Sequence, residues 1–495
     1  MLRVVSHPLG PLPPVAPRSA AWRADLDAAL IPGAGIDDAR RRLHQPDALV
    51  VTTGQQPGLF TGPLYSVHKA LSAAALARAL ERRWRRPVVP VFWIAGDDHD
   101  FAEASTVTWM DAAGKLVDWS LPARPATAPQ LPMSEEQLPA GVADGLSLLA
   151  ASLPAGQPRD ATLDWLRRHY VAGATLHRAF SGAMADLLAP FGVVCFDPTH
   201  RAAKQAQAPL LATALHRAAE LDRALAALPE AGTGIGSGDG ATLVFVTTNA
   251  GRERLLIDGK HFRTRRSGER FTRAEIDARL AREPERFSAN VLLRPVVESA
   301  LLPTVAYVAG PGEMAYLERQ ASVLYPLLDV ARQIPVPRWS GTVVERWAER
   351  LLERLDLGLD AVLADDGRLA RDVLERDFPG DAREAIDALR RQIASTGNVV
   401  AAAGKRIDPV LERAVMGRMR RLDQISGDVE KALLRHLRKR DDIAHAQYAR
   451  LVAGLRPRGK PQERVLSAPS FRGRYGEAWL NGVFEAISAW ADGAP

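Results

Sequence analysis

The chain has 495 residues, of which 47% are hydrophobic, 25% charged and 6% aromatic, a globular composition that excludes collagen-like, disordered and disulfide-rich classes. Its net charge is only +6 and no nucleic-acid-binding motif is present, so no nucleic-acid partner is expected. The single cysteine, Cys195, cannot form an internal disulfide and no apolar run of about 18 residues could cross a membrane, so we expect a cytoplasmic protein without a membrane partner.

The first legible stretch predicts a strand, a helix and a second strand. Residues 48–53 (ALVVTT) are apolar and β-branched, and they lead into a glycine-rich loop at 54–62. Helix formers fill residues 63–83, with a proline at the first position, where its missing N–H costs nothing. Residues 88–95 form a second apolar run. This order predicts a βαβ unit, hence parallel strands with a right-handed crossover.

Two further apolar runs, 191–196 and 304–309, also end in polar or glycine-rich turns. Together with the first two strands they predict an open α/β sheet, in which ligands bind beyond the carboxyl ends of the strands. The loops expected at that edge are 54–62, 96–103, 197–200 and 310–316.

Two segments interrupt this pattern. Residues 121–160 are rich in Pro, Ala and Ser and are interpreted as a loop-like insertion. Within 231–290, the segment GTGIGSGDG precedes a strand rather than a helix, so it indicates a linker and not a phosphate-binding loop. The runs that follow it predict a small antiparallel hairpin.

Beyond Pro337, charged helix formers dominate from about 342 to 456. Val415, Leu422 and Val429 recur at heptad spacing, but Ser426 breaks the companion positions. This imperfect seam favours an antiparallel helical hairpin or coiled-coil arm, and it leaves open a solvated bundle without dimerisation. A basic, proline-broken return follows at 456–464, and residues 475–490 predict an amphipathic helix docked on the core.

The expected domain boundaries follow from these changes in local composition. A core is expected over 1–341, with insertions at about 110–170 and 231–290, and a helical arm over 342–456. Residues 457–495 are expected to return to the core.

Tyr65, His68 and Lys69 form the first candidate group. They are spaced i, i+3 and i+4 near the start of the predicted helix, so they share a face close to the positive end of its dipole. Lys and His at this place could hold a phosphate or a carboxylate. The alternative is that Tyr65 packs in the core and Lys69 is solvated.

The acidic turn GDDHD (96–100) follows the second strand directly and forms the second group. Its carboxylates and imidazole repel one another or resist desolvation unless they bind something. They could bind a metal ion, sugar hydroxyls or an ammonium group, or supply His99 as a general base. The alternative is an exposed acidic turn.

The third group comprises Asn290, Arg294 and Glu313. Asn290 and Arg294 could offer an amide and a guanidinium to a carboxylate, and Glu313 lies beyond a glycine turn. The alternative for Arg294 is a structural ion pair with Glu313 or Glu298.

Cys195 lies within an apolar strand and is interpreted as a buried thiol rather than a nucleophile.

Long motifs of this chain resemble one family, the bacillithiol biosynthesis cysteine-adding enzymes (BshC). They are TGQQPGLFTGPLYSVHKA (53–70), PVVPVFWIAGDDHDFAEA (87–104), FSANVLLRPVVESALLPTVAYVAGPGEMAYLERQ (287–320) and PVPRWSGT (335–342). The resemblance implies a Rossmann-like α/β core with connecting-peptide insertions and a helical coiled-coil domain that pairs two subunits as a homodimer. It also implies a ligase that joins the carboxyl of L-cysteine to the amine of glucosaminyl-malate, the last step of bacillithiol biosynthesis.

The resemblance carries over a set of pocket residues. The implied catalytic residues are His99, Asp98, Asp100 and Lys69, and the implied substrate-binding residues are Gln55, Gln56, Tyr65, His68, Asn290, Arg294, Glu313 and Tyr316. The segment GIGSGDG departs from the more polar stretch of relatives, so no contact is carried over from that insertion.

Amide formation in water requires an activated acyl group, which makes ATP or ADP the expected cofactor; no metal ligand is assigned, and a metal requirement stays open. Two alternatives have different chemistry. One is an adenylate-forming or nucleotidyl-transfer enzyme of the class I synthetase kind with another acceptor. The other is a non-catalytic scaffold that binds a sugar or a nucleotide.

Overall fold

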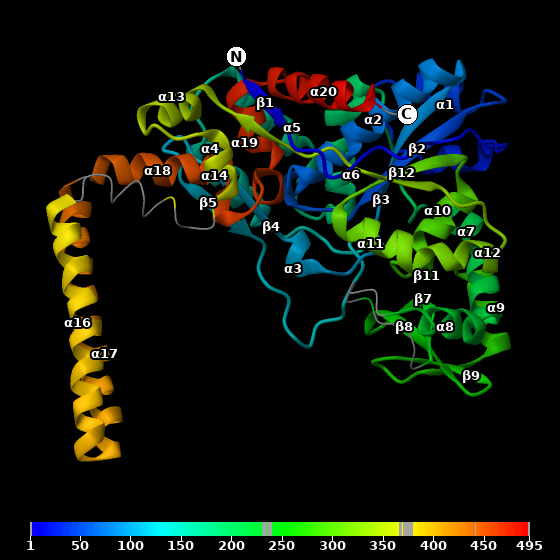
Figure 1. Cartoon of the computed structure of the whole chain (residues 1–495). Coiled ribbons are helices and arrows are strands. Elements are labelled where there is room, and N and C mark those ends of the chain that lie inside the picture. The colour runs from blue at the N-terminus through cyan, green and yellow to red at the C-terminus, as the bar shows by residue number, and fades with distance from the viewer. Residues whose placement is uncertain are drawn as a thin grey trace. The chain divides into compact units, whose positions relative to one another are not determined.

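The computed structural model describes residues 2–229, 235, 240–365, 369, 380–440 and 442–493. The chain divides into two compact units, the first comprising Met1–Val344 with Gln462–Pro495 and the second Glu345–Pro461. Figure 1 labels the helices and strands of both units. Among the described helices, none combines the length and the apolar character needed to span a bilayer.

The centre of the first unit is a five-stranded parallel sheet in the order β13-β12-β2-β3-β6. The α/β fold predicted from the sequence is therefore confirmed. Four strands match the predicted runs, whereas β13 was missed because its prolines argue against a strand. Proline lacks a backbone N–H and is tolerated at a sheet edge, where β13 lies. The strands are β2 (Leu49–Gln55), β3 (Val88–Ile94), β6 (Val194–Phe196), β12 (Thr304–Ala309) and β13 (Ile334–Pro337).

Alternation along β2 shows how the sheet is buried on both faces. Val50 belongs to one apolar cluster and Leu49 and Val51 to another, as expected for successive side chains of a strand. Helix α2 (Tyr65–Trp84) contributes to the second cluster and is buried along most of its length. The final helix, α20 (Ala478–Ala491), packs against α2, which confirms its predicted docking. Cys195 is a buried free thiol, as predicted.

The second sheet of this unit is antiparallel, in the order β10-β9-β8-β7-β11 (Figure 1). The predicted hairpin is present as β7 and β8 and is extended by three further strands. The predicted linker GTGIGSGDG lies outside the described residues except for Ile235 and Gly240. The strands are β7 (Ala241–Thr248), β8 (Gly251–Asp258), β9 (His261–Thr264), β10 (Arg270–Thr272) and β11 (Phe287–Ala289).

The prediction that 121–160 is loop-like was wrong in part. Helix α4 (Val142–Ser152) lies within this segment and α5 (Gln157–His169) begins in it. The prolines of this segment lie outside α4, and within α4 Leu146 and Leu149 form a short amphipathic pattern and are buried on one face.

Two small strand pairs, ten further α-helices and six short 3-10 helices complete the described part of this unit. The pairs are β1 (Arg3–Ser6) with β14 (Gly341–Val344) and β4 (Thr106–Met110) with β5 (Leu116–Ser120). The helices are α1 (Ile36–Leu43), α3 (Phe101–Ala104), α6 (Leu176–Leu188), α7 (Arg201–His216), α8 (Ala218–Ala226), α9 (Arg273–Arg282), α10 (Arg294–Leu301), α11 (Pro311–Arg319), α12 (Leu324–Leu327) and α19 (Ala468–Tyr475).

The second unit is helical and confirms the predicted antiparallel hairpin, formed by α16 and α17. A Cβ added at Gly397 would meet Met419 and one added at Gly404 would meet Leu411, so these glycines allow close packing of the helices. The described helices are α13 (Arg346–Arg354), α14 (Leu359–Ala364), α16 (Gly380–Ile407), α17 (Pro409–Arg440) and α18 (Asp442–Leu455).

The faces of this hairpin differ from the heptad prediction. Leu422 and Val429 are 45% and 51% exposed, whereas Ser426, which interrupts the heptads, is 3% exposed. Arg390 of α16 pairs with Glu430 of α17 at 2.8 Å beside Ser426. Small residues at the helix contact therefore leave Leu422 and Val429 of α17 on the outside.

Candidate functional site

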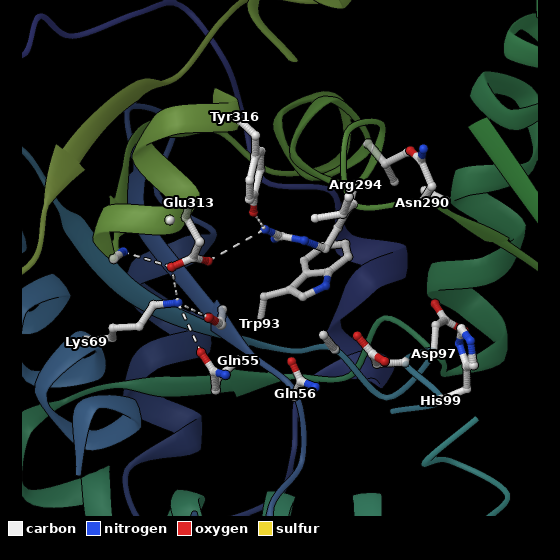
Figure 2. Close-up of a pocket in the computed structure, with 18 of the residues that line it drawn as sticks. Gln55, Gln56, Lys69, Trp93, Asp97, His99, Asn290, Arg294, Glu313 and Tyr316 are labelled. Carbon is white, nitrogen blue, oxygen red and sulfur yellow. Dashed lines mark hydrogen bonds and ion pairs between the residues drawn. The ribbon is translucent and has the colours of Figure 1, made fainter. Parts of the chain in front are cut away.

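A cavity of about 460 Å³ lies at the carboxyl ends of β2, β3 and β12 (Figure 2). Three of the four loops expected at this edge line it, and the loop at 197–200 does not. In the view of Figure 2, Lys69 and Glu313 lie on one side and Asp97 and His99 on the other. The antiparallel sheet adds part of the wall. The polar and charged lining residues are Gln55, Gln56, Tyr65, Lys69, Asp97, Asp98, His99, Gln207, Arg252, Arg254, Asn290, Arg294, Glu313, Tyr316, Arg338 and Arg464.

Lys69 joins the end of β2 to the start of α11. Its ammonium donates to the carbonyl oxygen of Gly54, to Oε1 of Gln55 at 3.3 Å and to Oε2 of Glu313 at 2.7 Å. Its side chain is only 1% exposed, so the alternative of a solvated lysine is wrong. Burial lowers the pKa of Lys69, and Glu313 partly offsets this. Because an ammonium has three donors, Lys69 has none left for a ligand in this arrangement.

Glu313 begins α11 and accepts a hydrogen bond from the backbone N–H of Gly310 at 2.8 Å. Burial by itself raises the pKa of this carboxyl, but the charges of Lys69 and Arg294 and the bonds that it accepts outweigh burial. The pKa of Glu313 therefore lies below its usual range, and the carboxylate stays charged.

Arg294 forms structural ion pairs, the alternative to a role in binding a ligand carboxylate. Its guanidinium lies 3.2 Å from Oε2 of Glu298 and 4.0 Å from Oε1 of Glu313. It also donates to the hydroxyl oxygens of Tyr307 and Tyr316, at 3.1 and 3.2 Å. The side chain still lines the cavity, so Arg294 contributes charge to the wall while most of its donors are engaged.

Asn290 and Tyr65 also line the cavity with their polar groups partly engaged. Oδ1 of Asn290 accepts from the backbone N–H groups of Leu292 and Leu293, at 3.1 and 2.9 Å. The Tyr65 hydroxyl donates to Oε1 of Glu103 at 3.2 Å. Burial, together with the neighbouring acidic turn, raises the pKa of Glu103 despite this bond.

The members of the acidic turn GDDHD have different partners. Asp97 accepts from the ammonium of Lys204 at 2.6 Å, and Lys204 is itself 1% exposed. Asp98 lines the cavity and accepts from the backbone N–H of Asp100 at 2.9 Å. Within the described residues, no ion pair involves Asp98.

His99 meets the antiparallel sheet. Its Nδ1 lies 3.1 Å from Nη1 of Arg252, and its ring centroid lies 6.1 Å from that of Phe245. Burial, and then the charge of Arg252, lowers the pKa of His99 against the opposing effect of Asp98. The imidazole is therefore neutral near pH 7.

Two residues expected at the site do not line the cavity. His68 is 0% exposed, and its Nδ1 bonds Oε2 of Glu463 at 2.8 Å. Successive helix residues point about 100° apart, so the neighbours His68 and Lys69 face different surroundings. Asp100 is exposed and instead caps α3, accepting from the N–H of Glu103.

Several cavity residues were missed by the sequence analysis. Arg252 and Arg254 are two residues apart on β8, so their side chains share a face; this spacing was visible, but only the folded sheet brings them to the cavity. Arg338 lies in the motif PVPRWSGT (335–342), and Arg464 ends the basic, proline-broken return at 456–464. Within the described residues, Arg254 and Arg464 form no ion pair, whereas Arg338 pairs with Glu463 at 2.5 Å.

The described residues contain no group of three or more His, Cys, Asp or Glu side chains arranged to hold a metal ion. The polar lining of the cavity consists of carboxylates, one imidazole, one ammonium, several guanidinium groups, and amide and hydroxyl groups. Such a set suits ligands that carry both an amine and acidic groups.

Comparison with known proteins gives matches over most of the chain. Residues 35–339 match the family model described as "Bacillithiol biosynthesis BshC, N-terminal Rossmann-like domain", and residues 341–491 match "Bacillithiol biosynthesis BshC, C-terminal coiled-coil domain".

Curated relatives agree with the domain matches. A protein of Heliobacterium modesticaldum named "Putative cysteine ligase BshC" is 32% identical over 474 residues, covering 92% of this chain and 84% of that protein. Proteins of the same name from Symbiobacterium thermophilum and Salinibacter ruber are 33% and 29% identical, covering 89% and 92% of this chain and 83% and 84% of their own lengths. With a Rossmann-like core, a helical coiled-coil unit and relatives matched along most of its length, the chain belongs to the BshC family of bacillithiol biosynthesis.

Proposed function

We propose that this protein is a cysteine ligase that joins the carboxyl group of L-cysteine to the amino group of glucosaminyl-malate, completing bacillithiol. Family membership and the names of the relatives support the reaction class. The observation that carries the proposal is a single cavity with an acidic turn on one side and guanidinium groups from other elements. An amine nucleophile needs the first, and carboxylate or phosphate groups need the second.

The amine of the sugar must lose a proton before it attacks an acyl carbon. The acidic turn offers His99 and Asp98 for this role. The geometry favours Asp98, because its carboxylate lines the cavity without an ion pair among the described residues, whereas Nδ1 of His99 faces a guanidinium. The proton would pass to a carboxylate oxygen of Asp98 as the carbon–nitrogen bond forms, and the bond between the acyl carbon and the oxygen of its AMP or phosphate leaving group would break, releasing that group.

The acidic groups of the substrates need cations with free donors. Lys69 and Arg294 supply positive charge to the wall, but their donors are largely taken by Glu313, Glu298 and the tyrosines. Arg254 and Arg464 form no ion pair among the described residues, so they are better suited to grip malate carboxylates directly.

Acyl activation also calls for a cofactor. ATP would supply an acyl-adenylate or acyl-phosphate from the cysteine carboxyl. The cationic side chains Lys69, Arg294 and Arg338 also line the cavity, and their charge favours a polyphosphate group there, so the chain's own residues fit such a group. Their work would be to orient it and offset its charge.

The test is reconstitution followed by mass spectrometry. Purified protein with L-cysteine, glucosaminyl-malate and ATP is expected to yield the amide, and a host lacking the chain is expected to lose the corresponding thiol. No product, with the thiol pool unchanged in the host, would refute the proposal. In ATP–pyrophosphate exchange, a response to another amino acid but not to cysteine would instead favour an adenylate-forming enzyme with a different acceptor.

We also propose that the protein forms a homodimer through the α16–α17 hairpin. Exposed apolar side chains support this, since Leu422, Ile425 and Val429 are 45%, 52% and 51% exposed on the helical unit. Light scattering is expected to give a dimer mass, and the double substitution Leu422→Glu and Val429→Glu is expected to give a monomer. A monomeric wild-type protein would contradict this part.

A further inference from the structure

Arg252 is held in one orientation by partners on every side. It is only 8% exposed, and its Nε donates to Oγ of Ser288 at 2.9 Å. Its Nη2 donates to the carbonyl oxygen of Ala289 at 2.9 Å. The guanidinium carbon lies 4.0 Å from the ring centroid of Phe245. Nη1 is thereby directed at His99.

The contact between Nη1 and Nδ1 of His99, at 3.1 Å, can have only one polarity. A guanidinium does not lose its proton in proteins and cannot accept a hydrogen bond. Nδ1 must therefore accept through its lone pair. A neutral imidazole that accepts at Nδ1 carries its proton on Nε2.

The other ring nitrogen is available. Nε2 of His99 has no hydrogen-bond partner in the described part of the chain, and the side chain is half-buried in the cavity wall. An Nε2–H group at this place can donate to an oxygen atom of a ligand. It cannot at the same time receive the proton of an amine.

The charges around His99 act in both directions. Arg252 and Arg266 oppose a positive imidazolium, and Asp98 and Asp100 favour it. Burial comes first among these effects and, together with the arginines, leaves the pKa of His99 below its usual range.

We propose that Arg252 is a positioning residue that holds His99 as the neutral Nε2–H tautomer, so that His99 donates a hydrogen bond to a substrate oxygen and does not act as the general base. The oxygen belongs to a carbonyl, carboxylate or phosphate group. The assignment of the tautomer is independent of the reaction, whereas the catalytic consequence rests on the proposed function.

The direct test is nitrogen-15 NMR of protein labelled at histidine, with the His99 signals identified by their loss in His99→Gln. Wild-type protein is expected to show a protonated Nε2 and an unprotonated Nδ1 at neutral pH. In Arg252→Gln, the pKa of His99 is expected to rise and the single tautomer to give way to a mixture. Arg254→Gln is the matched control, since it removes the same charge from the same face of β8 without a contact to His99, and it is expected to leave the tautomer unchanged.

A second variant guards against loss of folding. If Arg252→Gln does not fold, Ser288→Ala keeps Arg252 but removes one of its anchors, and a smaller shift in the same direction is expected. A wild-type Nδ1–H tautomer, or titration of His99 at an ordinary histidine pKa, would overturn the assignment.

Kinetics separate a donor from a base. Glutamine can place an N–H near the position of Nε2 but cannot accept a proton, so His99→Gln is expected to keep kcat within about tenfold of wild type, with His99→Ala lower. A general base would lose about 10²–10⁴-fold in both variants. If the tautomer is as proposed but no amide forms with the wild type, the proposed function fails and the positioning role stands.

Discussion

Two groups of charged residues lie at the same cavity and differ in how many of their hydrogen-bonding positions are still free for a ligand. The paired cluster comprises Lys69, Arg294 and Glu313, which line the cavity, together with the buried Glu298 that contacts Arg294; its members form ion pairs at 2.7–4.0 Å. The open group comprises Asp98, His99, Arg254 and Arg464, which form no ion pairs among the described residues. The difference shows that charge alone does not identify a reactive residue. A charged group whose hydrogen-bonding positions are all occupied by neighbouring residues holds those residues in place and cannot bind a ligand.

The two groups differ most in their carboxylates, since Glu313 is paired and Asp98 is not, and substitution of Asp98 is expected to have the largest effect on activity. Asp98→Asn removes the proposed base and is expected to lower kcat by about 10²–10⁴-fold with little change in stability. Product formation and thermal unfolding check the two parts. Asp37→Asn, at an exposed carboxylate paired with Arg40, is the control. Activity of Asp98→Asn equal to that of the control would place Asp98 outside the chemistry.

The paired cluster is expected to respond in stability. Lys69→Met removes the ammonium that bonds Glu313 and the carbonyl oxygen of Gly54 and leaves Glu313 only the more distant Arg294; breaking a buried pair in this way costs about 3–5 kcal/mol. Urea unfolding measures the loss. Arg82→Ala, which removes an exposed pair with Asp492, is expected to cost less than about 1 kcal/mol. Equal losses in both variants would show that the buried cluster contributes no more to the free energy of unfolding than an exposed ion pair does.

The cationic members of the open group are expected to act in binding. Arg254→Ala and Arg464→Ala are each expected to raise KM for the sugar–acid substrate by about tenfold, with a smaller change in kcat, because each removes a charged hydrogen-bond donor. Steady-state kinetics at two salt concentrations check this. A KM that does not move in either variant would assign substrate binding to other residues.

Within the paired cluster, Glu298 gives a pH dependence of stability. Burial raises the pKa of this carboxyl to about 7, against the opposing charge of Arg294 and the bond from Thr52. The folded state then binds a proton more tightly than the unfolded state. Stability is therefore fully present below the unfolded pKa and falls as pH rises toward 7, by at most about 1.4 kcal/mol per pH unit.

Glu298→Gln keeps a similar shape without a titrating group and is expected to flatten that part of the curve. Urea unfolding of both proteins from pH 5 to pH 8 gives the difference. Parallel curves would show that Glu298 does not titrate in this range.

Local patterns were sufficient for much of the parallel sheet. The runs that became β2, β3 and β12 are short, apolar and bounded by turn residues, so each could be identified without knowledge of its neighbours. Helix α2 was bounded in the same way, since a proline precedes it and Pro87 follows. By contrast, β13 contains prolines that only its edge position tolerates, and that position is a property of the folded sheet.

The site residues that follow strand ends could be predicted from the sequence. Those that the antiparallel sheet contributes could not. Lys69 and Asp98 come directly after predicted elements. Arg252 reaches the cavity only because β8 lies in a sheet with β7 and β11, a long-range arrangement that no local pattern encodes. His68 shows the opposite error, since helical spacing placed it near Tyr65 but its ring faces Glu463 instead.

The pairing of β11 with β7 has a consequence for how this molecule can be shortened. In sequence, residues 241–286 belong to an insertion, a kind of region that is often removed to obtain a shorter fragment. Yet the strand that completes their sheet runs straight into Asn290 and, four residues later, Arg294. Removing residues 241–286 would take away β7, the strand that pairs with β11, and would free the backbone that carries Asn290 and Arg294. A protein shortened in this way is therefore expected to lose both side chains from the cavity.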